Sequence, residues 1–309
     1  MFQRYIAEEI ATDCAEGVIS RREALARLTG FGLSAAAATA LIAACAPAEH
    51  QPAGESPRAD ASSGETAPSA PPPGAQGALA VEPATFPGSR GELIGAWSKA
   101  PNAQGAVLVI HENRGLTDHI KSIPGRLAGA GFSALAIDLL SEEGGTAKFA
   151  SQDEATKALM AAPPERFIAD LKSGLDELGR REPGKKLAVM GFCFGGGLTW
   201  QLLLTKDPRL AVGAPFYGPL HEEGPPGALV DFRGSEAAVI AFYGEQDARV
   251  NASRAAAENS LKAAGLTHAI VVERNANHAF FNDTGPRYVP AAANNAWLQL
   301  VSWLKKYLV

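Results

Sequence analysis

Residues Val189 to Gly197 read VMGFCFGGG, and this stretch decides the fold. It follows a short apolar run typical of a strand and opens a segment with helical periodicity. The pattern is Gly-x-Cys-x-Gly, a tight strand-to-helix turn in which small residues two positions before and after the central residue avoid clashes. In such a turn the Cys193 side chain projects above the strand end, where the N-terminus of the next helix favours a thiolate. The pattern predicts Cys193 as a nucleophile and the backbone N–H of Phe194 as an oxyanion donor.

The alternative interpretation of this stretch is a buried cysteine in a glycine-rich loop that binds a phosphate or a dinucleotide. The stretch has neither the GxGxxG spacing nor the GK[ST] ending of those loops. The nucleophile is therefore the favoured interpretation.

Apolar runs and helical patterns alternate on both sides of this turn, from Val81 to Val309. The alternation predicts an α/β domain with a mainly parallel central sheet flanked by helices on both faces. Several runs are apolar almost throughout, as expected of strands buried on both sides. The predicted strands are 106–110, 133–137, 187–190, 211–216, 237–243 and 269–273, and the predicted helices are 119–130, 153–161, 164–181, 196–205, 253–264 and 291–307.

A nucleophile in this kind of turn needs a histidine base, which follows it in chain order. Three histidines come after Cys193. His221 lies in a Gly/Pro-rich loop, and His268 lies directly before a predicted strand. His278 lies past the last predicted strand and before the closing helix, which is the loop position that a general base requires. We therefore expect His278 to be the base, and a surface histidine is the alternative.

The acid that orients the histidine should leave the strand before it. Asp247 follows strand 237–243 in the sequence GEQDARV. Its carboxylate would hold the imidazole tautomer and stabilise the charged form of the ring. Asp138 also ends a predicted strand, but it precedes the nucleophile and fits the chain order less well. Taken by itself, Asp247 is equally well explained as a turn- or helix-capping residue.

Four motifs together resemble the dienelactone hydrolase family. They are IHENRGL at 110–116, GFCFGG at 191–196, GEQDARV at 244–250 and NHAFFND at 277–283. The resemblance extends from about Val81 to the C-terminus. It implies an α/β-hydrolase fold and an enzyme that hydrolyses a carboxylic ester or lactone (EC 3.1.1) without a cofactor. It also implies a Cys-His-Asp triad of Cys193, His278 and Asp247.

The resemblance assigns two further residues. In that family a glutamate of the HE motif contacts the resting thiol and yields when substrate binds, and Glu112 would take this role. The backbone N–H of Asn113 would be the second oxyanion donor. The residues alone indicate only that Glu112 follows a strand end, where an exposed loop glutamate is the alternative.

One position departs from the family pattern. In dienelactone hydrolase an arginine shortly after the catalytic histidine grips the substrate carboxylate, whereas Asn282 stands here and the next arginine is Arg287. The resemblance therefore supports the type of reaction better than it supports the identity of the substrate. Arg114 is the remaining candidate for a charged substrate contact, and Phe281 is expected either to line the pocket or to pack in the core.

The first 45 residues have the layout of an export signal. Arg21 and Arg22 are followed by an apolar, uncharged stretch from Leu28 to Ala44. This layout resembles a twin-arginine (Tat) signal and predicts a bacterial protein exported to the periplasm. An amphipathic helix with a chance arginine pair is the alternative.

Small residues directly before Cys45 resemble a lipobox, which predicts a lipidated cysteine and a membrane-anchored lipoprotein. Ordinary cleavage, with Cys45 incidental, is the alternative. Residues 46–80 are rich in Pro, Ala, Ser and Gly, and such a segment is predicted to be a disordered linker. The predicted hydrolase domain is 81–309. Once the leader is removed, Cys193 is the only free thiol expected in that domain.

The composition excludes several other classes of protein. A chain of 309 residues with 46% hydrophobic residues can bury a substantial core, and a net charge of -5 gives no footprint for nucleic acid. The histidines and cysteines show no metal-type spacing, so we expect neither metal nor cofactor and a small-molecule ester or lactone as the partner. The competing hypothesis is a non-catalytic, tethered small-molecule-binding protein, which has no need of a complete triad. Thiol redox chemistry would need a second cysteine in the domain. The sequence leaves the oligomeric state open.

Overall fold

The computed structural model describes residues 2–15, 17–45, 71–221 and 229–309, and these fall into two compact units. The first unit is Met1–Pro71 and the second is Pro72–Val309. Each is described by itself.

The first unit contains three helices, α1 (Phe2–Ala15), α2 (Arg21–Gly30) and α3 (Ala35–Cys45). Ser20 caps α2, because its hydroxyl accepts a hydrogen bond from the Glu23 N–H over 3.2 Å. Arg21 and Arg22 are the first two residues of this helix, and both are exposed. Among the described residues, no helix combines the length and the apolar character needed to cross a bilayer. Export through the arginine pair and lipidation of Cys45 stay predictions.

The predicted linker lies mostly outside the described residues, which resume at residue 71. From Pro72 the chain forms a short 3-10 helix, η1 (Ala75–Gly77), and packs against the rest of the second unit. The Leu79 N–H donates to the Gly125 carbonyl over 2.9 Å, and a side chain at Gly74 would lie 2.5 Å from the Trp297 ring. The second unit thus begins at Pro72, ahead of the predicted boundary at Val81, because these residues obtain hydrogen bonds and apolar contacts that composition does not reveal.

The second unit is built on an eight-stranded sheet with the order β1-β2-β4-β3-β5-β6-β7-β8. The strands from β4 to β8 pair in parallel, while β1–β2 and β2–β4 pair antiparallel. The bounds are β1 Glu82–Gly88, β2 Gly91–Ser98, β3 Ala106–Ile110, β4 Ser133–Asp138, β5 Leu187–Phe192, β6 Leu210–Phe216, β7 Ala238–Gly244 and β8 His268–Glu273. The predicted mainly parallel sheet is confirmed, with every predicted strand in place.

Two strands at the edge, β1 and β2, were not predicted. β1 contains Pro83 and Pro87 and buries only alternate side chains, so it lacks the continuous apolar run of the central strands. β2 turns back from β1 at Gly88–Gly91 and then pairs with β4. This antiparallel hairpin covers the edge of a sheet whose other strands run parallel.

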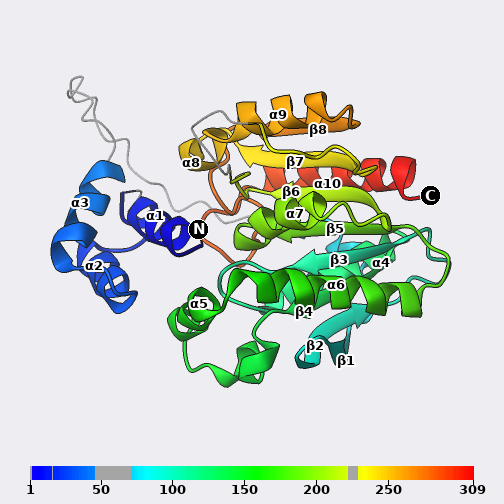
Figure 1. Ribbon diagram of the computed structural model, residues 1–309, viewed down its shortest axis with the longest axis horizontal. Coiled ribbons are helices and arrows are strands. Elements are labelled where there is room, and N and C mark those ends of the chain that lie inside the picture. The colour runs from blue at the N-terminus through cyan, green and yellow to red at the C-terminus, as the bar shows by residue number, and fades with distance from the viewer. Residues whose placement is uncertain (1, 16, 46–70, 222–228) are drawn as a thin grey trace, which may run out of the picture. The chain divides into compact units, whose positions relative to one another are not determined.

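Helices flank both faces of the sheet. Figure 1 shows α6 and α7 in front of the sheet, and α4 and α10 behind it. Amphipathic patterns explain these positions, since α6 buries Phe167, Leu171 and Leu175 along one stripe and exposes charged residues on the other. The helix bounds in this unit are α4 Asp118–Gly129, α5 Gln152–Ala161, α6 Pro164–Arg181, α7 Phe194–Leu204, α8 Ala248–Asn251, α9 Arg254–Ala263 and α10 Pro290–Tyr307.

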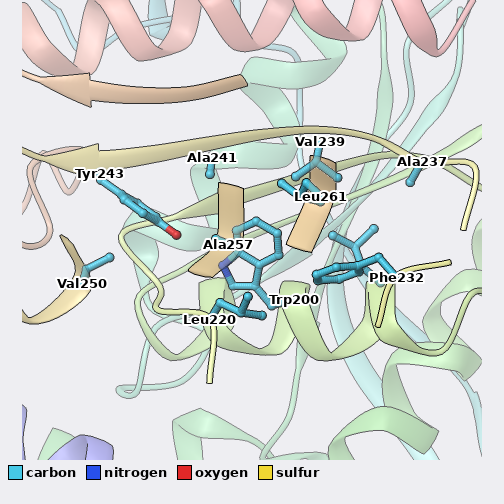
Figure 2. Packing of buried hydrophobic residues seen from close by; sticks show 11 residues of the cluster. Trp200, Leu220, Phe232, Ala237, Val239, Ala241, Tyr243, Val250, Ala257 and Leu261 are labelled. Atoms are coloured by element: carbon cyan, nitrogen blue, oxygen red, sulfur yellow. The ribbon is translucent and has the colours of Figure 1, made fainter. Parts of the chain in front are cut away.

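A hydrophobic cluster supports the helix that follows the nucleophile turn. Trp200 of α7 is fully buried, and Figure 2 shows its ring among Leu220, Phe232 and Leu261. The indole N–H donates to the Gly218 carbonyl over 3.1 Å, so its polar atom is satisfied inside the core. The cluster fixes α7 against β7 and thereby fixes the position of the turn before it.

Candidate active site

Cys193 lies between β5 and α7 in a strained backbone conformation, with φ 55° and ψ −114°. Residues with a side chain rarely adopt a positive φ, and such strain concentrates at functional sites. The turn is held because the Cys193 N–H donates to the Phe216 carbonyl over 3.0 Å, and the Cys193 carbonyl accepts from Gly197 over 3.1 Å. Phe194 is the first residue of α7, where backbone N–H groups point out of the helix N-terminus.

The glycines around Cys193 are required by close backbone contacts. A Cβ at Gly191 would lie 2.1 Å from the Gly195 carbonyl oxygen, and one at Gly195 would lie 2.5 Å from that of Ile110. A Cβ at Gly196 would lie 2.5 Å from the Phe216 carbonyl oxygen. These contacts pack the turn between β3 and β6, which explains the spacing of small residues in the sequence.

Asp247 and His278 form a direct pair, as the sequence predicts. Asp247 caps α8 at the end of β7, with one carboxylate oxygen accepting from the Val250 N–H over 3.1 Å. The other oxygen, Oδ2, lies 2.6 Å from His278 Nδ1. The carboxylate therefore keeps the proton on Nδ1 and leaves Nε2 as the basic nitrogen.

The pKa of the Asp247 carboxyl lies below its usual range. Burial raises this pKa, but the charge and hydrogen bond of His278 and the nearby Arg249 guanidinium outweigh the effect of burial. The guanidinium also lies close to the imidazole, with its Nη2 3.4 Å from His278 Nδ1. Asp247 is therefore ionised at neutral pH, the state in which it can orient an imidazole.

The imidazole faces the cysteine. His278 Nε2 is buried and has no hydrogen-bond partner among the residues that the structure describes. A ring nitrogen of His278 lies within 4.8 Å of Cys193 Sγ. A contact between a catalytic base and its nucleophile often tightens further when substrate binds. Chain segments far apart in sequence thus bring the three predicted residues together at the carboxyl ends of β5, β7 and β8.

Glu112 is held in the same region by two neutral donors. The Asn282 side-chain amide donates to Glu112 Oε2 over 2.7 Å, and the Tyr217 hydroxyl donates to Oε1 over 3.3 Å. The Asn282 amide is oriented by Thr284, whose N–H and hydroxyl both donate to Asn282 Oδ1. The Tyr217 ring stands edge-on to the His278 ring, with centroids 5.3 Å apart. Tyr217 therefore connects the carboxylate of Glu112 to the histidine.

The loop that carries Glu112 and Asn113 is fixed by buried polar contacts. His111 Nε2 accepts from the Leu139 N–H over 3.0 Å, so the proton is on Nδ1, which donates to the Glu112 carbonyl over 2.6 Å. Burial lowers the pKa of His111, which keeps the ring neutral. The Asn113 carbonyl accepts from the Thr156 hydroxyl over 2.9 Å. This loop lies beside the nucleophile turn, since Gly195 packs on the Ile110 carbonyl.

The other residues singled out in the sequence have different places. Phe281 is fully buried and stacks on Phe192 at 5.6 Å, which is the core-packing role. Arg114 is half-buried, and its contact with substrate stays a prediction. Asp138 accepts hydrogen bonds from Leu140 and Thr146, so it shapes the loop after β4. His268 lies at the start of β8, with Nδ1 2.8 Å from the Leu266 carbonyl oxygen.

Several residues of this region were missed by reasoning from the sequence. Tyr217 follows β6 directly and has φ 36°, so its position just after a strand end was a usable signal. His119 and Arg126, on one face of α4, both bind the carboxylate of Asp283. Asp283 is the last residue of the NHAFFND motif, but the motif did not reveal its two partners, because they lie more than 150 positions earlier in the chain.

Comparisons with known proteins agree on one family. Residues 94–308 match the Dienelactone hydrolase family. A Salmonella typhimurium protein named "Putative carboxymethylenebutenolidase" is 32% identical over 242 residues, which cover 75% of this chain and 89% of the relative. The crystal structure of "Putative Dienelactone Hydrolase" from Klebsiella pneumoniae superposes with a TM-score of 0.63 at 25% identity, covering 74% of this chain and 99% of the other. A dienelactone hydrolase from Anabaena variabilis, at 19% identity and a TM-score of 0.57, covers 74% of this chain and 99% of its own and shares the fold.

Proposed function

Since the chain belongs to the dienelactone hydrolase family of α/β-hydrolases and is an ester or lactone hydrolase, we propose that Cys193, His278 and Asp247 carry out the reaction. The observation that carries the proposal is the His278–Asp247 bond of 2.6 Å next to a cysteine in a strained turn. An aspartate on Nδ1 and a thiol facing the other nitrogen give each residue a defined role.

In the first half of the reaction His278 Nε2 takes the thiol proton and the Cys193 thiolate attacks the carbonyl carbon. The tetrahedral intermediate collapses as the carbon–oxygen bond to the leaving group breaks, and the imidazolium returns its proton to the departing alkoxide. In the second half His278 removes a proton from water, the hydroxide attacks the thioester, and the thiol leaves with that proton. The ionised Asp247 carboxylate stabilises the imidazolium in both halves.

The backbone N–H groups of Phe194 and Asn113 are the proposed donors to the developing oxyanion. Support comes from the position of Phe194 at the N-terminus of α7 and from the packing of the 111–113 loop against the nucleophile turn. Glu112 is proposed to restrain the resting thiol. Its two neutral hydrogen-bond donors, Asn282 and Tyr217, supply no positive charge beside Glu112, so a substrate carboxylate is not expected to bind at this position. Arg114 stays the candidate for a charged substrate contact.

The test is hydrolysis of a panel of small activated esters and lactones, dienelactone included, by the full chain. Cys193→Ala and His278→Ala are expected to abolish turnover while the protein stays folded by circular dichroism. Asp247→Asn is expected to lower kcat about 10⁴-fold, the effect of losing the oriented tautomer in a hydrolytic triad. A mass increase on Cys193 equal to the acyl group, seen after rapid acid quench, would identify the thioester. Turnover by Cys193→Ala equal to that of the unaltered chain would refute the triad.

We also propose that the leader directs export and that Cys45 receives lipid. The exposed arginine pair at the start of α2 and the apolar α3 that ends at Cys45 support this proposal. Expression in a bacterium with radiolabelled palmitate tests it. Replacing Arg21 and Arg22 by lysine should retain the protein in the cytoplasm, and Cys45→Ser should remove the label.

A further inference from the structure

A buried ion cluster joins the loop after His278 to α4. Asp283 accepts from Arg126 Nη2 over 2.7 Å with Oδ2, and it bonds to His119 Nδ1 with Oδ1. His119 and Arg126 are seven positions apart on α4, so both lie on the same face of the helix. The Arg126 side chain is 4% exposed and that of Asp283 10%, so the charges are largely removed from water.

The carboxylate in this cluster is ionised. Burial raises the pKa of Asp283, but the hydrogen bonds and charges of His119 and Arg126 outweigh burial and lower it to about 2. Such a pair has well-defined geometry, because an ionised carboxylate in a poorly hydrated place depends on both donors. The cluster thus fixes the backbone at Asp283 relative to α4.

The residue before Asp283 is the one that contacts Glu112. Asn282 reaches Glu112 Oε2 over 2.7 Å, and its own backbone N–H donates to the Ala279 carbonyl over 3.0 Å. Ala279, the residue after His278, has φ 59°. The segment from His278 to Asp283 is therefore a short, strained turn, with the base at one end and the ion cluster at the other.

We propose that Asp283 is a positioning residue for the hydrolysis. Its two partners on α4 hold the turn so that the Asn282 amide reaches Glu112 and His278 stays aligned with Asp247. The members of the cluster bond to one another, and we infer that they act on the site through Asn282. This inference rests on the proposed function in one respect, since it takes Glu112 as part of the catalytic site.

A double-mutant cycle on the full chain tests the proposal. Asp283→Ala and Asn282→Ala are each expected to lower kcat/KM about tenfold, the usual effect of losing one hydrogen bond to a charged group. The double variant should have the same kcat/KM as the less active of the two single variants, because both changes remove the same contact. The decrease should appear in kcat and not in KM. A second readout is the rate at which iodoacetamide alkylates Cys193, measured by peptide mass spectrometry. This rate should change equally in both single variants.

Asp207→Ala is the matched control. Asp207 is also a largely buried carboxylate, 9% exposed, paired with an arginine, Arg209. It lies between α7 and β6, at the end of the parallel strands opposite Cys193. Asp207→Ala should lower the melting temperature and leave kcat/KM within about twofold of the unaltered chain. In the variant that carries both Asp207→Ala and Asn282→Ala, the two effects on kcat/KM should multiply.

Multiplicative effects of Asp283→Ala and Asn282→Ala, or an unchanged kcat/KM in Asp283→Ala, would overturn the positioning role. If Asp283→Ala does not fold, the cycle is run with Asp283→Asn, which keeps the shape of the side chain. A failure of the proposed function is separate from these outcomes, since it would appear as turnover by Cys193→Ala equal to that of the unaltered chain.

Discussion

Asn282 and Glu112 are joined by a 2.7 Å hydrogen bond although they lie 170 positions apart in the sequence. The bond places a neutral amide against a carboxylate at a position where the family resemblance implies an arginine. Asn282→Arg is therefore expected to pair with Glu112 and to add positive charge to the site. It should raise kcat/KM for an ester that carries a carboxylate relative to its uncharged analogue by about tenfold, the scale of one charge-assisted contact.

The measurement compares a methyl ester of a monocarboxylic acid with the half-ester of a dicarboxylic acid of matched length. Asn282→Gln is the control, because it keeps an uncharged amide. If the ratio of the two kcat/KM values is the same in Asn282→Arg and in the unaltered chain, the charge at this position does not set substrate preference.

The glycines of the nucleophile turn provide a sharp steric prediction. Gly195→Ala would place a methyl group 2.5 Å from the Ile110 carbonyl oxygen, so the turn or β3 must move. We expect a loss of stability of about 1–3 kcal/mol, as for other overpacked sites, and a collapse of activity. Gly197→Ala is the control two positions away, where the nearest atom lies at 3.8 Å.

Gly197→Ala should be neutral or should stabilise α7 by up to about 1 kcal/mol, because alanine favours a helix over glycine. The free energies of unfolding of Gly195→Ala and Gly197→Ala, measured by urea denaturation, test both expectations. Equal stability of both variants would mean that the packing around Gly195 is looser than these distances indicate.

His111 makes stability depend on pH. The folded protein holds this ring neutral with a lowered pKa, whereas in the unfolded chain the pKa is about 6.5. Below that pH the unfolded state binds a proton that the folded state excludes, so the contribution of His111 is lost as the pH falls from about 6.5. His111→Gln keeps a donor and an acceptor and cannot titrate.

Melting temperatures of both proteins between pH 8 and pH 5 test this expectation. The difference between the unaltered chain and His111→Gln should be constant above pH 7 and should shift in favour of His111→Gln at lower pH. Parallel curves over the whole range would show that the ring titrates alike in the folded and unfolded states.

The segment 72–80 is expected to stabilise the hydrolase unit. The Pro73 carbonyl accepts a hydrogen bond from Arg126 Nη1 over 3.5 Å, and Gly74 packs on the Trp297 ring. The segment therefore covers part of the ion cluster to which Arg126 belongs. A chain that begins at Leu79 should melt at a lower temperature than one that begins at Pro71. Identical melting temperatures of the two shortened chains would show that the segment contributes nothing.

The sequence by itself predicted the parallel sheet, which the structure confirms, and it singled out the residues of the proposed triad. Buried parallel strands require continuous apolar runs, and a strained turn at Cys193 requires small residues at fixed offsets, so both leave a local pattern. His278 and Asp247 could be placed because each lies in the loop that follows such a run. These features depend on residues close together in the chain.

Only the tertiary structure decided which polar groups meet around the site. The contacts of Tyr217 and Asn282 with Glu112, and of Asp283 with α4, join segments whose sequences carry no common pattern. The start of the unit at Pro72 was hidden for the same reason. Residues rich in Pro, Ala and Gly are ordered here by neighbours on α4 and α10, and a contact with a distant surface cannot be read from local composition.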